Sequence, residues 1–285
     1  RSWWHGWRST GMGVDIPGPD GLSLLGLFAA LVPGSDQLIL TLVVLAAFPV
    51  GAIGLWLLVR PIGGGRSRAV AVVVYLAFPL PYDALREGRL TPLIGYALIP
   101  WLARYLVSAQ GGFSFGSVNG HSRTTVLQSS LLGNALMVGL LIAIGVAFDP
   151  IVVVPILTVF AGLVLGNAMT GNLIGLKRLS LVALGGFIVA LLIHLPLAVQ
   201  ILNSGSITFL FEPNVWPVGD LGTSGIFNLD TGSFRNDAFG WVFFVVPMMV
   251  FFVTARRHLV LGICAWFVIA AGLCGVWMFD QGWWT

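Results

Sequence analysis

Charge is scarce in this chain. Only 9% of its 285 residues are Asp, Glu, Lys or Arg, whereas soluble domains carry about 25%. Apolar residues make up 57%, and the mean hydropathy is +0.95. This composition excludes a water-soluble globular domain and predicts a membrane protein. The chain lacks an initiating Met and has Trp-rich ends, so we expect a segment of a longer polypeptide.

Several chemical signatures are missing as well. The sequence has no HExxH, no EF-hand pattern and no Asp-x-Asp pair, so it predicts neither a metal nor another cofactor. The glycines of Gly63–Arg68 are not followed by the Lys-Ser/Thr of a phosphate loop. Its two cysteines, Cys264 and Cys274, lie in one apolar run; a helix would place them about 15 Å apart, beyond disulfide reach. We therefore expect both to be packing residues.

Apolar runs dominate what is present. A membrane span needs about 17–25 mainly apolar residues. Seven runs satisfy this length, and Ala69–Tyr82, broken by Pro79 and Pro81, satisfies it with its flanks. Leu22–Val32 is too short and predicts an interfacial helix. The seven full-length runs are Gln37–Val59, Leu90–Ser108 (interrupted by Pro92 and Pro100), Ser130–Phe148, Ile151–Met169, Leu179–Asn203, Phe239–Ala255 and Leu259–Phe279.

The predicted fold class is all-α, a polytopic membrane helical bundle with about eight spans and a short interfacial helix. Residues 1–36 would form an outer loop with that helix, and 37–203 a six-span core. Residues 204–238 would form a second outer loop, and 239–285 a two-span hairpin. The Gly- and Ser-rich stretch Ala109–Ser129 predicts a flexible inner linker.

Basic residues predict the orientation of these spans, because loops on the cytoplasmic side are enriched in Lys and Arg. Nine basic residues fall in one set of alternate loops or at its helix ends: Arg60, Arg66, Arg68, Arg104, Arg123, Lys177, Arg178, Arg256 and Arg257. All eleven acidic residues fall on the opposite side. Two interpretations stay open: the acids only solvate the outer face, or they belong to an outward-facing polar site.

The densest charge cluster lies in the outer stretch Tyr82–Leu93. One helical turn would bring Asp83, Arg86 and Glu87 together, and Arg89 follows closely. The arginines are suited to holding a phosphate, because a guanidinium is a planar fork for anions. The alternative is a solvated loop whose charges pair with one another.

The first 21 residues form a second candidate site. Trp3, Trp4 and Trp7 match Trp283 and Trp284 at the other end, as in an aromatic belt at the membrane surface. A belt does not explain the polar residues between them. His5 and Arg8 are candidate anion ligands, and Asp15 is a candidate proton acceptor.

One histidine falls inside an apolar run. His194 lies two residues before Pro196, toward the outer half of its predicted span. Polar side chains at such depth usually face the bundle interior. Its ring would either bind local backbone, where proline leaves a carbonyl without its N–H donor, or contact a substrate.

The stretch WWHGWRSTGMGVDIPGPDGLSLLG resembles a segment of large actinobacterial membrane glycosyltransferases of the GT-C type. This group includes arabinofuranosyltransferase-like proteins and proteins whose membrane part follows a cytoplasmic family-two glycosyltransferase domain. The resemblance covers most of the chain as loose spacing. It is carried by Trp4–Trp7, Gly11–Gly13, Pro17–Pro19, Leu22–Val32, Gly88–Leu90, Gly240–Trp241, Arg256–Arg257, Ala265–Phe267 and Gly282–Trp283.

The resemblance implies a multi-pass plasma-membrane protein that is active on its extracytoplasmic face. The donor would be a polyprenyl-phosphate-linked sugar and the acceptor a cell-envelope glycan. In such enzymes the catalytic carboxylate usually lies in the first outer loop, and this chain starts partway through that loop. We therefore expect the usual acid upstream, with Asp15, Asp83 and Glu87 as the candidates within the chain.

Two other functions remain open at the level of sequence. A transporter or flippase is disfavoured because no internal repeat is visible and His194 is the only ionisable residue well inside a span. A non-catalytic membrane anchor for an attached soluble domain would need no outward polar cluster. Nucleic acid is not expected as a partner, because the basic residues form only small clusters near the membrane. Membrane lipid is expected as one.

Overall fold

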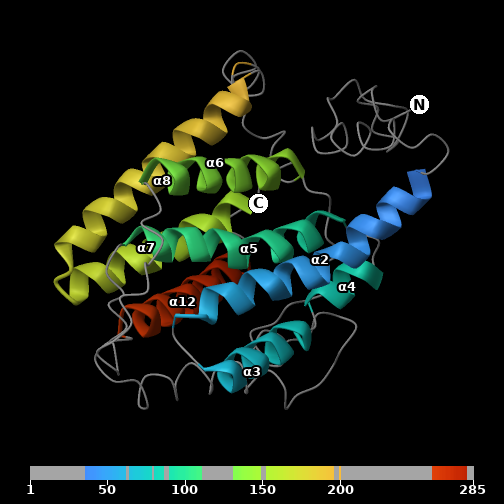
Figure 1. Ribbon diagram of the computed structural model, residues 1–285, viewed down its shortest axis with the longest axis horizontal. Coiled ribbons are helices and arrows are strands. Elements are labelled where there is room, and N and C mark those ends of the chain that lie inside the picture. Colours follow the sequence, from blue (N-terminus) through green and yellow to red (C-terminus); the bar gives the residue numbers. More distant parts are fainter. Residues whose placement is uncertain are drawn as a thin grey trace.

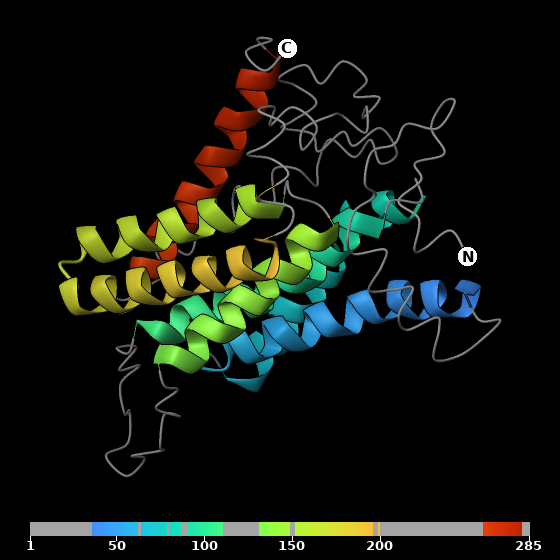
Figure 2. The same ribbon diagram turned by 90° about the horizontal axis from the view of Figure 1, so that it is seen from above.

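The computed structural model is a bundle of helices (Figures 1 and 2). The structure describes residues 36–61, 64–78, 80–86, 90–110, 131–148, 152–195, 199 and 259–280. Within these ranges the chain is almost entirely helical and contains no strand, as the predicted fold class requires. The helices are α2 (Asp36–Val59), α3 (Gly65–Leu76), α4 (Leu80–Arg86), α5 (Leu90–Ala109), α6 (Leu131–Phe148), α7 (Val153–Met169), α8 (Leu173–Ile193) and α12 (Leu259–Asp280).

Three of these helices are long and apolar enough to cross a membrane: Leu38–Val59 in α2, Leu131–Phe148 in α6 and Leu173–Ile193 in α8. The 24 residues of α2 span about 36 Å, against about 30 Å for a hydrocarbon core. These helices indicate a membrane protein. The total of eight spans stays a prediction. Leu22–Val32, Phe239–Ala255, the linker and the loop at 204–238 lie outside the described residues.

Prolines affect two predicted spans in opposite ways. The predicted break in the run Ala69–Tyr82 is confirmed at Pro79, because α3 ends at Leu76 and α4 begins at Leu80. Pro79 has no N–H to continue the helix and disfavours helical geometry in the residue before it. Pro81 does not break the chain again, since it lies in α4, and whether this run crosses the membrane stays a prediction. The predicted interruption of the next run is wrong, since α5 is continuous and contains Pro100.

Helix α8 begins six residues earlier than predicted and ends ten residues earlier, at Ile193. Asn172 caps its first turn by accepting a hydrogen bond from the Gly175 N–H at 3.1 Å. Before it, Gly171 adopts a φ of 71°, which an L side chain rarely tolerates. This tight turn places Lys177 and Arg178 within the first turns of α8 rather than in a loop.

Glycines allow the closest helix pairs to form. A Cβ added to Gly139 of α6 would lie 2.6 Å from Val189 Cβ and 2.7 Å from the backbone oxygen of Gly186 on α8. On α7, Gly162 and Gly166 are four residues apart and face α12, as in the small-residue interfaces of membrane helices. The backbone of α6 therefore lies in close contact with α8, and that of α7 with α12.

The main core lies among α5, α6, α7, α8 and α12. Its most deeply buried members are Leu106, Val138, Leu163, Leu179 and Val182. Cys264 of α12 is buried there beside Gly162, while Cys274 is exposed. Both cysteines are unbridged, as expected for two residues of one helix, but the expected packing role is confirmed for Cys264 alone, because Cys274 is exposed.

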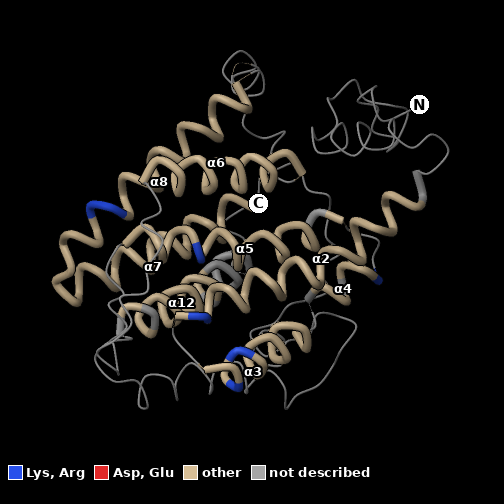
Figure 3. Tube along the Cα trace, viewed as in Figure 1, with Lys and Arg blue, Asp and Glu red and all other residues tan. Residues whose placement is uncertain are grey.

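Most Lys and Arg residues of the described chain lie toward one end of the bundle, around the α2–α3 connection and in the first turns of α8 (Figure 3). Arg60, Arg66 and Arg68 belong to the first group, and Lys177 and Arg178 to the second. Arg86 closes α4 toward the opposite end. We call these the basic end and the α4 end of the bundle. Which end faces the cytoplasm stays a prediction.

Candidate functional site at the alpha4 end

Helix α4 carries the described part of the predicted charge cluster. Its inner face is anchored by Ala84, which is only 5% exposed and packs in one cluster with Ala47 of α2 and with Leu93 and Ala97 of α5. Pro81 in its first turn is also buried. The seven-residue helix is therefore seated on the bundle by apolar contacts, which fixes the position of its backbone.

The charged residues of this cluster fall partly within the described chain. Asp83 lies in α4 rather than in the predicted loop, and Arg86 is the last residue of the same helix, with an exposed side chain. One helical turn separates them, as the spacing predicted. Glu87 and Arg89 lie outside the described residues. The helix thus presents an exposed cation one turn from a carboxylate-bearing residue.

Two tyrosines lock α3 to α5 beneath α4. The Tyr75 hydroxyl donates a hydrogen bond to the backbone oxygen of Tyr96 at 2.6 Å, and the Tyr96 hydroxyl donates to the backbone oxygen of Tyr75. Their rings stack with centroids 4.1 Å apart and an interplanar angle of 14°. Each tyrosine precedes a proline by four residues, Pro79 and Pro100 respectively.

The spacing to proline gives the bond to the Tyr96 carbonyl a physical reason. In a continuous helix, the N–H of residue i+4 would donate to the carbonyl of residue i, and proline has none to give. An unpaired carbonyl is costly in an apolar medium. The hydroxyl of Tyr75 therefore replaces the donor that Pro100 lacks. This is why α5 continues through a proline that was expected to interrupt it.

Further aromatic residues extend this contact to α2 and α4. Phe48 of α2 lies 5.3 Å from the Tyr82 ring and 6.4 Å from the Tyr96 ring, centroid to centroid. The Tyr82 hydroxyl donates to the backbone oxygen of Leu76 at 2.7 Å, so α4 also closes the end of α3. We call Phe48, Tyr75, Tyr82 and Tyr96 the aromatic cluster. All three tyrosine hydroxyls are engaged with backbone, which favours a supporting role over proton transfer.

His194 lies at the end of α8, where α8 meets α6. Its Nε2 lies 2.8 Å from the backbone oxygen of Ala143, and because a carbonyl only accepts, this bond requires the proton on Nε2. The contact matches the backbone-binding alternative, although the backbone is that of another helix. A substrate role for His194 stays a prediction.

The remaining predicted site residues lie outside the described chain. His5, Arg8 and Asp15 belong to the first 35 residues, and nothing tests their expected anion-binding or base roles. Within the described ranges, no three His, Cys, Asp or Glu residues come together as a metal site would require. Of the candidate site residues at the α4 end, the structure therefore describes only Asp83 and Arg86, together with the residues that hold α4 on the bundle.

Sequence reasoning missed the tyrosine pair, although a signal was present. The segments YLAFP (75–79) and YALIP (96–100) repeat a Tyr-x-x-x-Pro pattern in neighbouring apolar runs. A Gly-x-Ser-x-Gly pattern also occurs at residues 112–116, outside the described chain. It follows helix α5 rather than a strand, so it lacks the context of a nucleophile elbow.

Comparison with known proteins found no relative: no protein-family model, curated protein or solved structure matches this chain.

Proposed function

We propose that the chain is the membrane module of a glycosyltransferase. It transfers a sugar from a polyprenyl-phosphate donor to a cell-envelope glycan at the extracytoplasmic face of the plasma membrane. The observation that carries the proposal is α4, which holds Asp83 and Arg86 one turn apart on a bundle of membrane helices. The resemblance of the Trp-rich opening stretch to GT-C enzymes supplies the substrate class.

The chemistry requires a base and a cation. A carboxylate, from Asp83, Glu87 or Asp15, removes the proton of an acceptor hydroxyl, and the resulting nucleophile attacks the anomeric carbon. The bond from that carbon to the lipid phosphate breaks, and the leaving phosphate gains negative charge. Arg86, with Arg89 and Arg8, stabilises that charge. Support for this assignment comes from the exposure of Arg86 at a helix end seated on the apolar bundle.

The location also favours a lipid-linked donor. A polyprenyl chain needs an apolar surface and its phosphate a nearby cation. Around α4, Tyr82 and Leu85 are exposed apolar or aromatic residues close to Arg86 in the chain. His5 and His194 are further proposed donor or acceptor contacts. An attached cytoplasmic family-two glycosyltransferase domain is the proposed partner at the basic end.

Native mass spectrometry of the detergent-purified protein tests the donor site, with added polyprenyl phosphate as the probe. We expect one bound molecule per chain and weaker retention in Arg86→Gln and Arg89→Gln. A charge-assisted hydrogen bond contributes about 1.5–3 kcal/mol, so each substitution should weaken binding by about tenfold or more. Arg66→Gln, another exposed helix-terminal arginine but at the basic end, is the matched control.

Transfer itself is tested with the same variants in membranes, using a labelled polyprenyl-phosphate sugar. Asp83→Asn and Glu87→Gln should lower transfer while leaving lipid retention unchanged, because a base is needed only for the chemical step. Equal retention of polyprenyl phosphate by the wild type, Arg86→Gln and Arg66→Gln would contradict the proposal. That result would favour the alternative function, a non-catalytic membrane anchor.

A further inference from the structure

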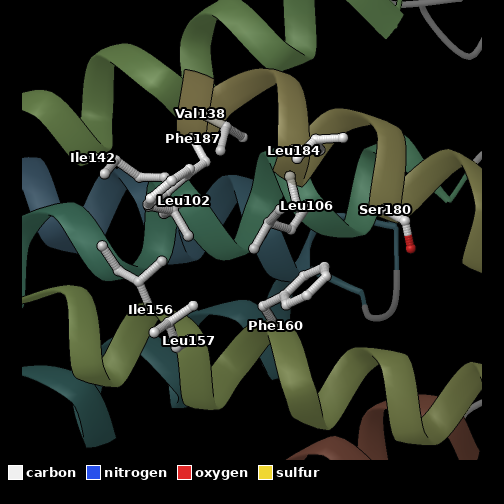
Figure 4. A pocket seen from close by; sticks show the side chains of 11 residues that line it. Leu102, Leu106, Val138, Ile142, Ile156, Leu157, Phe160, Ser180, Leu184 and Phe187 are labelled. Atoms are coloured by element: carbon white, nitrogen blue, oxygen red, sulfur yellow. The ribbon is translucent and has the colours of Figure 1, made fainter. Parts of the chain in front are cut away.

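An apolar cavity of about 220 Å³ lies between α7 and α8, with α5 and α6 at its floor (Figure 4). Leu102 and Leu106 of α5 form part of the floor, and Phe160 of α7 faces them. Leu184 and Phe187 of α8 line it while remaining 60% and 52% exposed. The cavity is therefore open along the outer surface of the bundle. We call it the α7–α8 groove.

The size of the groove suits a stretch of hydrocarbon. An apolar cavity of about 150 Å³ already holds a benzene ring. The stretch of α8 from Ser180 to Phe187 gives it a length of about 10 Å. Since α8 is itself apolar and long enough to cross a membrane, the open side of the groove meets lipid chains.

The described lining of the groove is polar at one end. Ser180 is the sole polar residue among the described residues that line it, and Lys177 lies one turn further toward the basic end. Positions 177, 180, 184 and 187 are spaced by three or four residues, so they share one face of α8. Lys177 is exposed, and Arg178 beside it is exposed as well. On this face of α8, the apolar residues that line the groove are thus followed by the hydroxyl of Ser180 and then by the ammonium group of Lys177.

No acidic residue occurs in α5, α6, α7 or α8 to neutralise these two cations. The basic end of the groove therefore offers the positive charge of Lys177 and the hydroxyl of Ser180 next to an apolar trough. An anionic headgroup with an attached chain complements both parts.

We propose that the α7–α8 groove binds one anionic phospholipid of the surrounding membrane. One acyl chain lies against Leu106, Leu184 and Phe187, and the phosphate lies at Lys177 and Ser180. A second copy of the chain would fill the trough with apolar side chains but would leave Lys177 without an anion. The groove is lined by Leu102 and Leu106 in the second half of α5, whereas α4 packs on the first half of that helix, so the groove does not depend on the proposed glycosyl transfer.

Native mass spectrometry of the full chain distinguishes the two parts of this site. The probes are phosphatidylglycerol and phosphatidylcholine with identical acyl chains. Leu184→Trp fills the groove, and Leu181→Trp is its matched control, because Leu181 is equally 60% exposed on α8 but does not line the groove. Lys177→Gln removes the cation, and Arg66→Gln removes an exposed arginine elsewhere at the basic end.

Wild type, Leu181→Trp and Arg66→Gln should retain one phosphatidylglycerol, more strongly than phosphatidylcholine. Leu184→Trp should weaken retention of both lipids by about tenfold, the effect of displacing two buried methylenes. Lys177→Gln should weaken phosphatidylglycerol by about fivefold and phosphatidylcholine less, because the choline cation already offsets the charge of its phosphate. Equal retention of lipid by Leu184→Trp and Leu181→Trp would contradict binding of an acyl chain in the groove. Equal retention of the two lipids by the wild type would contradict recognition of an anionic headgroup. Displacement of phosphatidylglycerol from the groove by equimolar polyprenyl phosphate would overturn the choice of ligand.

Discussion

The hydroxyl of Tyr75 lies 2.6 Å from the backbone oxygen of Tyr96, the carbonyl that Pro100 leaves without its helical donor. The reciprocal bond from Tyr96 reaches the Tyr75 carbonyl, which also accepts a hydrogen bond from the Phe78 N–H at 3.2 Å. Helix α3 thus supplies the donor that Pro100 removes from α5, and the second bond strengthens the same contact. Because α4 begins directly after this contact and packs on α5, the pair also sets where Asp83 and Arg86 lie.

Tyr75→Phe should lower the free energy of unfolding by about 1–3 kcal/mol, the usual effect of leaving a buried carbonyl unpaired. Denaturant-induced unfolding in mixed micelles measures this change. Tyr105→Phe on α5 is the control and should have little effect. The decisive variant is Pro100→Ala, which restores an N–H for the Tyr96 carbonyl. In that background Tyr75→Phe should be nearly neutral, and additive effects would show that the hydroxyl does not replace the proline's missing donor.

Gly51→Ala should disturb the same contact from α2. A Cβ at this position would lie 2.1 Å from the Tyr75 hydroxyl oxygen and 2.9 Å from its ring, which is held by stacking on Tyr96. Overpacking of this kind costs about 1–3 kcal/mol. Gly65→Ala, with nothing within 4 Å, is the matched substitution. A thermal melt of the two variants should separate them, and unchanged stability of Gly51→Ala would mean that Tyr75 has room to move.

Gly139→Ala should separate α6 from α8. The added methyl would meet the backbone oxygen of Gly186, and backbone cannot move aside as a flexible side chain can. We expect a loss of stability of several kcal/mol or a failure to fold, seen as a shift to aggregate in size-exclusion chromatography. Gly272→Ala in α12 has open space around it and should behave as wild type or slightly better. Monomeric, fully stable Gly139→Ala would refute this close packing.

His194→Phe should reduce stability by about 1–3 kcal/mol, because it removes the 2.8 Å bond that joins α8 to the Ala143 carbonyl. Retention of polyprenyl phosphate should not change if the ring serves only to join the helices. Both quantities are measured on one preparation, by unfolding and by native mass spectrometry. Unchanged stability together with lost retention of polyprenyl phosphate would instead support the predicted contact between His194 and substrate.

Much of the secondary structure follows from local sequence. The start of α2 at Asp36 and the bounds of α6 agree with the apolar runs to within one residue, because an apolar segment in a membrane must satisfy its backbone within a helix. The start of α8 was missed, since the Asn172 cap and the turn at Gly171 are polar signals upstream of its apolar run. The prediction that Pro100 interrupts its helix was wrong for a different reason: the hydroxyl of Tyr75, on another helix, takes the place of the missing N–H.

The sequence by itself determined that this is a helical membrane chain, with an α3–α4 break at prolines and a charge cluster after it. Composition and periodicity act within one helix, so they suffice for such features. Only the tertiary structure decided that Tyr75 rescues the carbonyl freed by Pro100, that His194 binds α6, and that four helices leave a groove whose polar end is at Ser180. These contacts depend on which faces of neighbouring helices pack together. That packing is set by close backbone contact at glycines such as Gly139, and not by the local conformational preference of the sequence.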